Sequence, residues 1–147
     1  MPSFSRQINV ISRCASAYRT DRFEGCGISS AHYFYIIAVC KNPGISQDRL
    51  AKKLYINKSS VARVLQTLEG DGFITRTPCE SDRRMTLVYP TEKAEKLLPI
   101  IKEATENWES FLFDSLEEIE REQFMTTLEK LYRKAASYVE NEREGEK

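Results

Sequence analysis

Several features that would place this chain in other protein classes are scarce or absent. No apolar run approaches the ~20 residues that a membrane-spanning helix requires, and residues 1–6 lack the apolar core of a secretion signal. The four cysteines form no Cys-x-x-Cys pair, and His32 is the single histidine that could join them as a metal ligand. We therefore expect a cytoplasmic protein with reduced thiols, no metal site and no cofactor.

Net charge is absent as well, yet the charges are unevenly distributed along the chain. The 22 Lys and Arg balance the 22 Asp and Glu. Residues 41–93 nevertheless carry ten basic against six acidic residues, whereas residues 94–147 carry eight against fourteen. A basic middle indicates a segment that meets a polyanion, and an acidic end indicates one that favours solubility or meets a partner. The alternative is a chance imbalance on solvated surfaces.

Two short helices joined by a tight break are predicted in the basic segment. Ser46 is a good N-cap for the first helix, and Asn57 follows the break and caps the second, which runs to about Glu69. Such a pair is typical of a helix-turn-helix, although many helical proteins contain one. The predicted inward-facing residues are Leu50, Ala51, Leu54, Val61, Val64 or Leu65, and Leu68.

A β-hairpin is predicted directly after this pair. Residues 73–77 and 84–89 are rich in β-branched and aromatic side chains, and residues 78–83 form a polar, turn-rich loop between them. A hairpin directly after a helix-turn-helix is a wing. The helix pair followed by a wing is a more specific signal of a winged helix-turn-helix than the helix pair alone. The predicted fold class is therefore mostly α with a small β-hairpin wing, a winged helix-turn-helix flanked by N- and C-terminal helices.

Caps and helix breakers set the remaining boundaries. Ser29 or Ser30 is predicted to cap a helix that ends at residues 42–44 (Asn-Pro-Gly). Thr91 is placed to cap a long helix after the wing, and Pro99 should kink that helix or mark a short initial segment. These boundaries divide the single chain, residues 1–147, into a winged module and flanking helical regions. The predicted module covers 29–91, and the predicted dimerisation regions cover 1–28 and 92–141.

Three helices outside the helix-turn-helix carry long apolar stripes at helical spacing. A small winged domain cannot cover all three, so we expect them to be buried against a second copy in a two-fold dimer. The alternative is that they pack on one another within one chain. The stripes are Phe4, Ile8, Ile11, Ala15 and Tyr18; Leu98, Ile101, Thr105, Trp108 and Leu112; and Phe124, Leu128, Leu131, Ala135 and Tyr138.

Residues 82–94, which run from the wing loop into the following helix, resemble the signature of the MarR family of winged helix-turn-helix transcriptional regulators. That signature is an aspartate, one residue, an arginine, five residues, Leu-Thr, two residues and a glycine. Asp82, Arg84 and Thr91 match it, whereas Pro90 stands in place of the leucine and Ala94 in place of the glycine. The two departures fall at the wing-to-helix junction and leave the wing tip unchanged.

Residues 65–76 also resemble the family's passage from recognition helix to wing, and the resemblance covers nearly the whole chain. It implies a homodimer that binds double-stranded DNA at a pseudo-palindromic operator. It further implies a repressor that a small aromatic or anionic effector releases from DNA. No membrane partner is expected, and the protein is predicted not to be an enzyme.

The predicted DNA contacts lie on the outward face of the second helix and on the wing. Arg63 could form a fork on a guanine, and Lys58 suits a phosphate. By the family resemblance, Arg84 would enter the minor groove, and Asp82 would orient Arg84 or Arg83 through a charge-assisted bond. Each residue alone has the alternative of a solvated surface role. The predicted DNA-binding residues are Ser46, Asn57, Lys58, Ser59, Ser60, Arg63, Arg83 and Arg84, with Asp82 as wing support.

The sequence is compatible with two kinds of switch, a small effector and a thiol. The candidate effector-binding residues have aromatic side chains with a polar edge and are expected near the junction of the winged module and the flanking helices. The alternative is that they are aromatic residues of the core. A thiol switch at Cys14 is the rival, because some relatives sense peroxides through a cysteine in the first helix. The effector candidates are Tyr18, His32, Tyr35 and Trp108.

Two other classes of function fit the sequence less well. A winged-helix adaptor for proteins would expose apolar residues where this chain has Arg83, Arg84 and a polar helix face. A thiol peroxidase built on Cys14 or Cys79 lacks a nearby histidine partner and a nucleophile motif.

Overall fold

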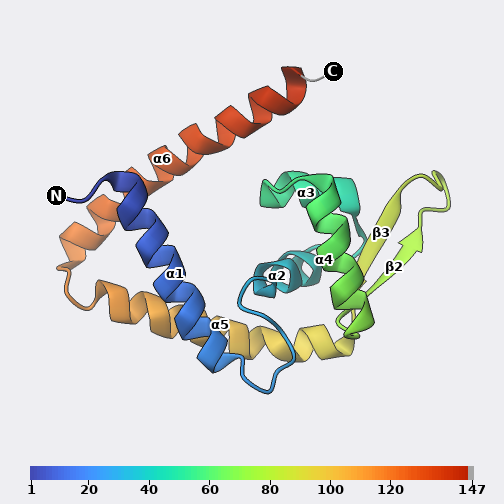
Figure 1. Cartoon of the computed structure of the whole chain (residues 1–147), viewed down its shortest axis with the longest axis horizontal. Helices are drawn as coiled ribbons and strands as arrows, with labels where there is room; N and C mark the ends of the chain where they lie inside the picture. Colours follow the sequence, from blue (N-terminus) through green and yellow to red (C-terminus); the bar gives the residue numbers. More distant parts are fainter. Residues whose placement is uncertain (146–147) are drawn as a thin grey trace. The chain divides into compact units, whose positions relative to one another are not determined.

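The computed structural model describes residues 1–145, with side chains described through residue 142. It forms two compact units, residues 1–108 and the residues from Glu109 onward, and each is considered by itself. Over the described residues the chain is mostly helical with a small antiparallel sheet, which confirms the predicted fold class (Figure 1). The elements are α1 (Phe4–Arg22), α2 (Tyr33–Lys41), β1 (Ile45–Ser46), α3 (Gln47–Leu54), α4 (Lys58–Gly70), β2 (Ile74–Pro78), β3 (Thr86–Pro90), α5 (Glu92–Phe113) and α6 (Glu118–Gly145).

The core of the first unit joins α2, α3, α4, the sheet and the first half of α5. The predicted inward faces of α3 and α4 are confirmed, with Leu54 and Val64 half-buried. Because side chains from every one of these elements meet in one apolar cluster, the helix-turn-helix and the base of the wing share a common support. Its largest fully buried side chains are Phe73, Ile36, Leu50, Leu65, Leu68, Ile74, Ile101, Val39, Val61 and Val88.

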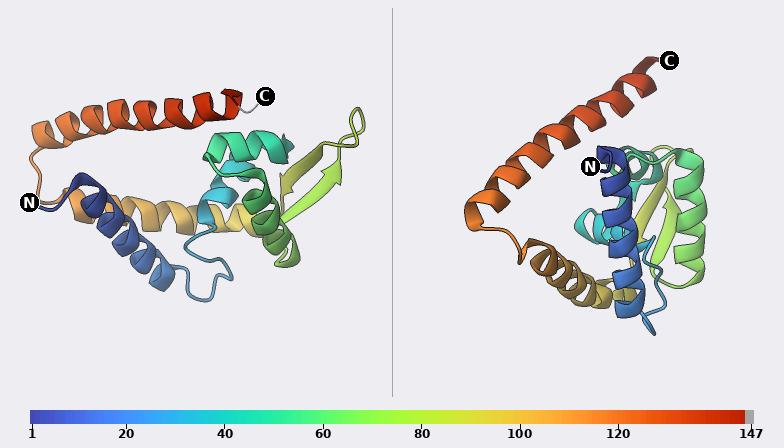
Figure 2. Two further views of the ribbon diagram at one scale, coloured as in Figure 1. Left: turned by 45° about the horizontal axis from the view of Figure 1, so that its top comes forward. Right: turned by 60° about the vertical axis from the view of Figure 1, so that its left-hand side comes forward.

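The three strands form an antiparallel sheet in the order β1-β3-β2, and β2 and β3 extend beyond α3 and α4 as a hairpin (left panel of Figure 2). Pairing runs from Ile74 opposite Pro90 to Pro78 opposite Thr86. The second strand begins two residues later than predicted. The Met85 amide donates to the Asp82 carbonyl at 2.9 Å, so the intervening residues turn and cannot join the ladder.

Both predicted N-caps of the helix-turn-helix are confirmed. Ser46 Oγ accepts from the Arg49 amide at 3.2 Å, and Asn57 Oδ1 accepts from the Ser60 amide at 2.8 Å. Each oxygen satisfies one amide at a helix start that would otherwise lack a partner. Between the helices, Tyr55 adopts a left-handed backbone conformation (φ 55°), which ends α3 and lets the chain turn.

The predicted start of α2 is wrong by two or three residues. The helix begins at Tyr33, and His32 occupies the N-cap position without a side-chain cap. Ser30, one of the two predicted caps, has another use: its Oγ lies 2.9 Å from Ser16 Oγ and accepts from Thr20 Oγ1 at 3.0 Å. The hydroxyl therefore ties the loop to α1, and residues 29–32 form turns instead of helix.

The long helix after the wing begins as predicted. Thr91 Oγ1 accepts from the Ala94 amide at 3.4 Å and donates to the Gly72 carbonyl at 2.7 Å, which links the cap to the turn between α4 and β2. Ala94, which stands where the family has glycine, is fully buried. Because α5 continues through Pro99, the predicted short initial segment does not form. The alternative outcome, a kink at Pro99, stays a prediction, since the ring cannot donate a helix hydrogen bond.

The apolar stripe of α1 is only partly covered. Ala15 is buried and Tyr18 half-buried, but Phe4, Ile8 and Ile11 are exposed. The first half of α1 therefore presents the kind of apolar face that helices bury against a partner.

In the second unit, α6 also leaves its stripe largely uncovered. The Phe113 and Phe124 rings pack with centroids 6.0 Å apart, yet Phe124, Leu131 and Tyr138 remain exposed, the last by 67%. None of the described side chains of α6 is buried. Within the described part of the chain, no helix has both the length and the hydropathy needed to cross a bilayer.

Candidate nucleic-acid interface

The N-terminal half of α4 presents short polar side chains and one arginine to solvent. Asn57 Oδ1 accepts from Ser59 Oγ at 2.8 Å in addition to the Ser60 amide, so the cap also orients the first serine of the helix. Arg63 is exposed and lies one turn further on, with Nη2 3.4 Å from Ser60 Oγ. Small residues at a helix start allow close approach to a groove, and the arginine supplies a guanidinium fork.

Lys58 is exposed, and its charge is paired. Its Nζ lies 3.0 Å from Asp48 Oδ2 across the turn between α3 and α4. An exposed pair of this kind contributes at most about 1 kcal/mol to stability. Lys58 can therefore exchange Asp48 for a phosphate at little cost.

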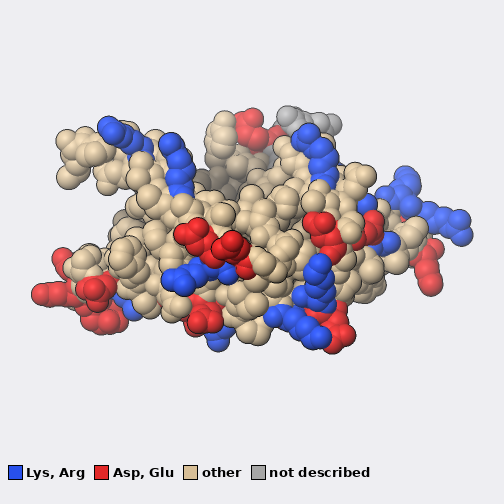
Figure 3. Space-filling model, turned by 60° about the horizontal axis from the view of Figure 1, so that its bottom comes forward, with Lys and Arg blue, Asp and Glu red and all other residues tan. Residues whose placement is uncertain are grey.

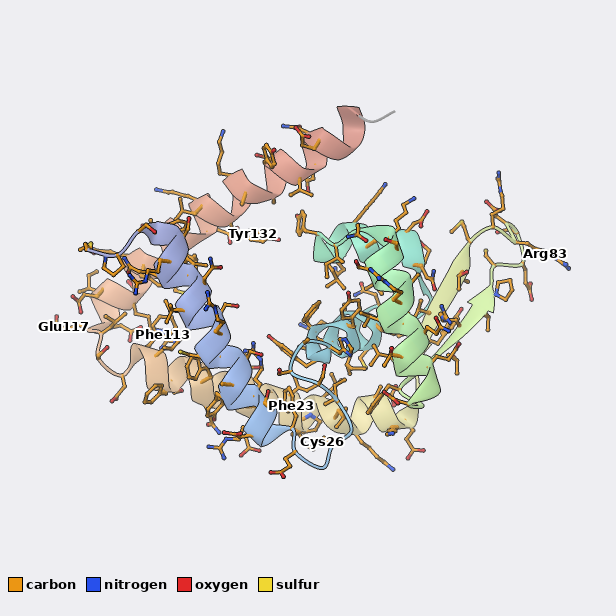
Figure 4. The ribbon with its side chains drawn as sticks, viewed as in Figure 1. Phe23, Cys26, Arg83, Phe113, Glu117 and Tyr132 are labelled. Carbon is orange, nitrogen blue, oxygen red and sulfur yellow. The ribbon has the colours of Figure 1, made fainter. Side chains whose placement is uncertain are left out.

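The wing tip carries an arginine held in one orientation. Arg84 donates to Asp82 from its backbone amide (3.1 Å to Oδ1), from Nε (3.2 Å to Oδ1) and from Nη2 (3.4 Å to Oδ2). The Arg84 side chain is nevertheless 92% exposed. Arg83 is also exposed and lies at the end of the hairpin (Figure 4), and basic side chains project at this end of the molecule (Figure 3).

Ser46 requires a correction to the predicted set. It is 5% exposed, and its hydroxyl is engaged as the N-cap of α3. A buried side chain cannot reach a duplex without unfolding its surroundings. We therefore assign Ser46 to the support of α3 and leave it out of the candidate contacts.

Three cations on α3 were not among the sequence candidates. Arg49, Lys52 and Lys53 are exposed on the side of α3 opposite the buried Leu50 and Ala51. The first helix of a helix-turn-helix crosses the DNA backbone, where cations meet phosphates without reading bases. The helical period that predicted the buried face of α3 also identifies this outward face.

The predicted effector residues form two separate aromatic pairs. Tyr18 packs against Trp108 with ring centroids 5.3 Å apart, and His32 meets Tyr35 edge-on at 6.2 Å. Tyr35 is buried, and that burial raises the pKa of its hydroxyl above the usual value. None of the four lines a groove of about 830 Å³ between α2 and α5, whose lining includes Ile37, Lys41, Leu98, Pro99, Ile101 and Lys102.

The four cysteines differ in their surroundings. Cys14 is exposed on α1, as the thiol-switch hypothesis requires. Hydrogen bonds from the Ser81 hydroxyl and from the backbone amides of Asp82 and Ser81 lower the pKa of the Cys79 thiol in the wing loop. Burial raises the pKa of Cys40, and the nearby Glu95 raises it further.

A helix-turn-helix followed by an antiparallel hairpin, with cations on both, defines a winged-helix DNA-binding protein. The model of the MarR family matches residues 28–86. The HTH-type transcriptional regulator BilQ of Clostridium symbiosum is 35% identical over 105 residues, which cover 71% of this chain and 73% of BilQ.

Solved structures agree with this class. The transcriptional regulator SlyA superposes with a TM-score of 0.88 and 27% identity, covering 95% of this chain and 98% of that one. A MarR family regulator from Listeria monocytogenes, solved with a 26mer DNA, superposes with a TM-score of 0.86 and 25% identity, covering 99% and 97%. This chain belongs to the MarR family and is a DNA-binding transcriptional regulator.

Proposed function

We propose that the protein acts in the cytoplasm as a homodimeric repressor. It binds a pseudo-palindromic operator and leaves it when a small aromatic or anionic ligand binds. The observation that carries the DNA-binding part is the exposed, orientated Arg84 on a wing whose base shares one core with α4. In this arrangement α4 lies in the major groove and the wing lies over the adjacent minor groove.

Within α4, Arg63 makes the base-reading contact, and Ser59 and Ser60 allow the helix to approach the groove closely. Lys58 and the α3 cations Arg49, Lys52 and Lys53 meet phosphates. These contacts are electrostatic, so affinity must fall steeply as salt rises.

Homodimerisation is supported by the exposed apolar side chains of α1 and α6, considered separately. Phe4, Ile8 and Ile11 on α1, and Phe124 and Leu131 on α6, have large exposed fractions. Apolar stripes at this spacing are unusual on a monomer surface and are buried when helices of a second copy pack on them. We assign the apolar stripes within the helical regions 1–28 and 92–141 to this interface, and residues 29–91 to DNA. Two-fold symmetry then places recognition helices about 34–36 Å apart.

The test is a salt titration of binding to DNA from the protein's own upstream region. Anisotropy should show tight binding to one duplex and weak binding to a scrambled one, with log Kd linear in log salt. Arg63→Ala should lose discrimination between the two, whereas Lys96→Ala, which removes a cation paired with Glu92 at 2.8 Å outside the proposed surface, should bind like wild type. A monomer by sedimentation at micromolar concentration, or indifference to every duplex at low salt, would refute the proposal.

The effector class is supported by the chemistry of the groove between α2 and α5. Leu98, Pro99 and Ile101 provide an apolar lining, and both cations (Lys41 and Lys102) and carboxylates (Glu95 and Glu106) line the groove as well. Lys102 pairs with Glu106 at 3.7 Å, so Lys41 is the cation that we assign to an anionic ligand. Benzoate carries both complementary features and is the probe of choice. It should weaken operator binding by the wild type and have less effect on Lys41→Gln; equal weakening of the two would remove this groove as the site.

A second candidate is a thiol switch at Cys14, favoured by the exposure of that thiol on α1. Mild peroxide followed by mass spectrometry decides the matter. An unmodified Cys14 with DNA binding intact would eliminate this candidate.

A further inference from the structure

A network of three side chains links the wing to both helices of the helix-turn-helix. Arg76 lies on β2, Glu69 near the end of α4, and Gln47 at the start of α3. The Arg76 backbone amide donates to Glu69 Oε2 at 2.9 Å. Its guanidinium donates to Glu69 Oε1 from Nη2 at 3.1 Å and from Nε at 3.4 Å, and Nη1 donates to Gln47 Oε1 at 3.2 Å.

The network is more sheltered than the other ion pairs of the chain's described part. The side-chain exposure of Arg76 is 23% and that of Glu69 is 39%, whereas each of the other ion pairs, Arg84–Asp82 included, has at least one partner that is exposed by more than half. The side-chain hydrogen bond from Arg76 lowers the pKa of Glu69 below its ordinary value of 4.5. A half-buried guanidinium fork with an additional backbone donor fixes both the direction in which β2 leaves α4 and the distance between them.

A two-stranded hairpin such as β2–β3 needs a contact that holds it in one orientation relative to the helices. Isolated hairpins are marginally stable and twist readily, and β1 adds only Ile45 and Ser46 to this sheet, paired with β3. On the β2 side, Ile74 is buried against the core, but the outer residues Thr75, Thr77 and Pro78 are exposed. Arg76 is thus the point between the buried base and the exposed tip at which β2 is bonded to α3 and α4.

We propose that Arg76, Glu69 and Gln47 are positioning residues that set the angle of the wing relative to the recognition helix. They make Arg84 and Arg63 engage their two grooves simultaneously. The proposal rests on the proposed DNA-binding function and adds residues that need not touch DNA. Its consequence is specific: loss of the network removes the contribution of the wing and leaves that of α4.

Glu69→Gln is the most informative change. It keeps the shape of the side chain and one acceptor oxygen but removes the charge that holds the guanidinium fork. It also removes a negative charge from a protein that binds a polyanion, which by itself would tighten binding. Weaker binding by Glu69→Gln therefore cannot be explained by net charge.

The experiment is a double-mutant cycle measured by anisotropy on the operator duplex. The variants are Glu69→Gln, Arg84→Ala and the double mutant, with thermal unfolding followed by circular dichroism. Glu129→Gln is the matched control, because Glu129 accepts from Arg133 Nε at 2.7 Å in an exposed Glu–Arg pair on α6 and is not part of the apolar stripe that we assign to the dimer interface. Gln47→Ala removes the third arm of the network without changing charge, and tests the proposal if Glu69→Gln fails to fold.

Glu69→Gln should weaken operator binding about 5- to 20-fold in the wild-type background. In the Arg84→Ala background, where the wing no longer contributes, the same change should cost less than about 2-fold. Gln47→Ala should show the same dependence with a smaller loss, and Glu129→Gln should bind like wild type.

Two results would overturn the inference while leaving the proposed function in place. One is wild-type or tighter binding by folded Glu69→Gln, and the other is an equal loss in both backgrounds, which indicates a merely structural role. If folded wild-type protein ignores the duplex, the proposed function falls, and this inference falls with it.

Discussion

Replacing Asp82 with alanine sets two opposed electrostatic effects against each other at the wing tip. Asp82 accepts three hydrogen bonds from Arg84, at 3.1, 3.2 and 3.4 Å. It also places a negative charge on a wing that we assign to DNA. If its charge matters most, its removal tightens binding; if its orienting bonds matter most, its removal weakens binding.

The structure favours the second outcome. Immobilising a long side chain on binding costs about 0.5–1.5 kcal/mol, and in the free protein Asp82 already restricts Arg84. A dimer has two wings, so the lost pre-organisation is about 1–3 kcal/mol. Relief of repulsion acts in the opposite direction at both wings, but salt screening at physiological ionic strength reduces the ~1 kcal/mol of a close contact in water to about 0.5 kcal/mol per wing. The expected net result is binding weaker by up to about 30-fold.

Anisotropy titrations at several salt concentrations distinguish the two effects. Asp82→Ala should leave the salt slope nearly unchanged, because every cation is retained. Arg84→Ala should lose most of the binding and reduce the slope by about 0.9 for each phosphate contact removed. Tighter binding by a folded Asp82→Ala protein would show that Asp82 does not orient Arg84 for DNA.

Three further outcomes are expected. Leu65→Ala, at a fully buried position of α4, should lower the free energy of unfolding by about 2–5 kcal/mol in urea titrations at fixed protein concentration; a loss below 1 kcal/mol would contradict the packing described. Glu69 contributes stability that is present above pH 4.5 and is lost as acid titrates the carboxylate through its lowered pKa, so acid melts of Glu69→Gln should depend less on pH in that range than those of wild type. Finally, Cys79 should react with iodoacetamide before Cys40 near neutral pH, because its pKa is lowered and that of Cys40 is raised; peptide mass spectrometry showing the reverse order would contradict this.

Local signals predicted the helix-turn-helix and much of its candidate surface. Capping by Ser46 and Asn57 involves residues three apart, and the buried faces of α3 and α4 follow from the helical period. The outward residues Arg63 and Arg84 follow from the same patterns together with the family resemblance. The sequence predicted that Asp82 orients Arg84 or Arg83, because a carboxylate beside phosphate would be repelled. The structure bonds Asp82 to Arg84.

Where local signals competed, the prediction was less accurate. Ser30 looks like a helix cap in sequence, but its hydroxyl bonds to Ser16, fourteen positions earlier. Ser46 is both a good cap and a plausible DNA contact, and only its burial at the base of α3 separates the two roles. The strand β1 has two residues, too few for any periodicity to reveal.

The sequence alone thus determined which segments become helix or hairpin and which faces turn inward, because those choices depend on neighbours within one or two turns. Tertiary structure alone decided how the wing is joined to the helices. Gln47 and Arg76 are 29 positions apart, and they meet only because burial of Leu65, Ile74 and their neighbours brings α3, α4 and β2 together. No pattern along the chain encodes that meeting, since it results from packing the whole core.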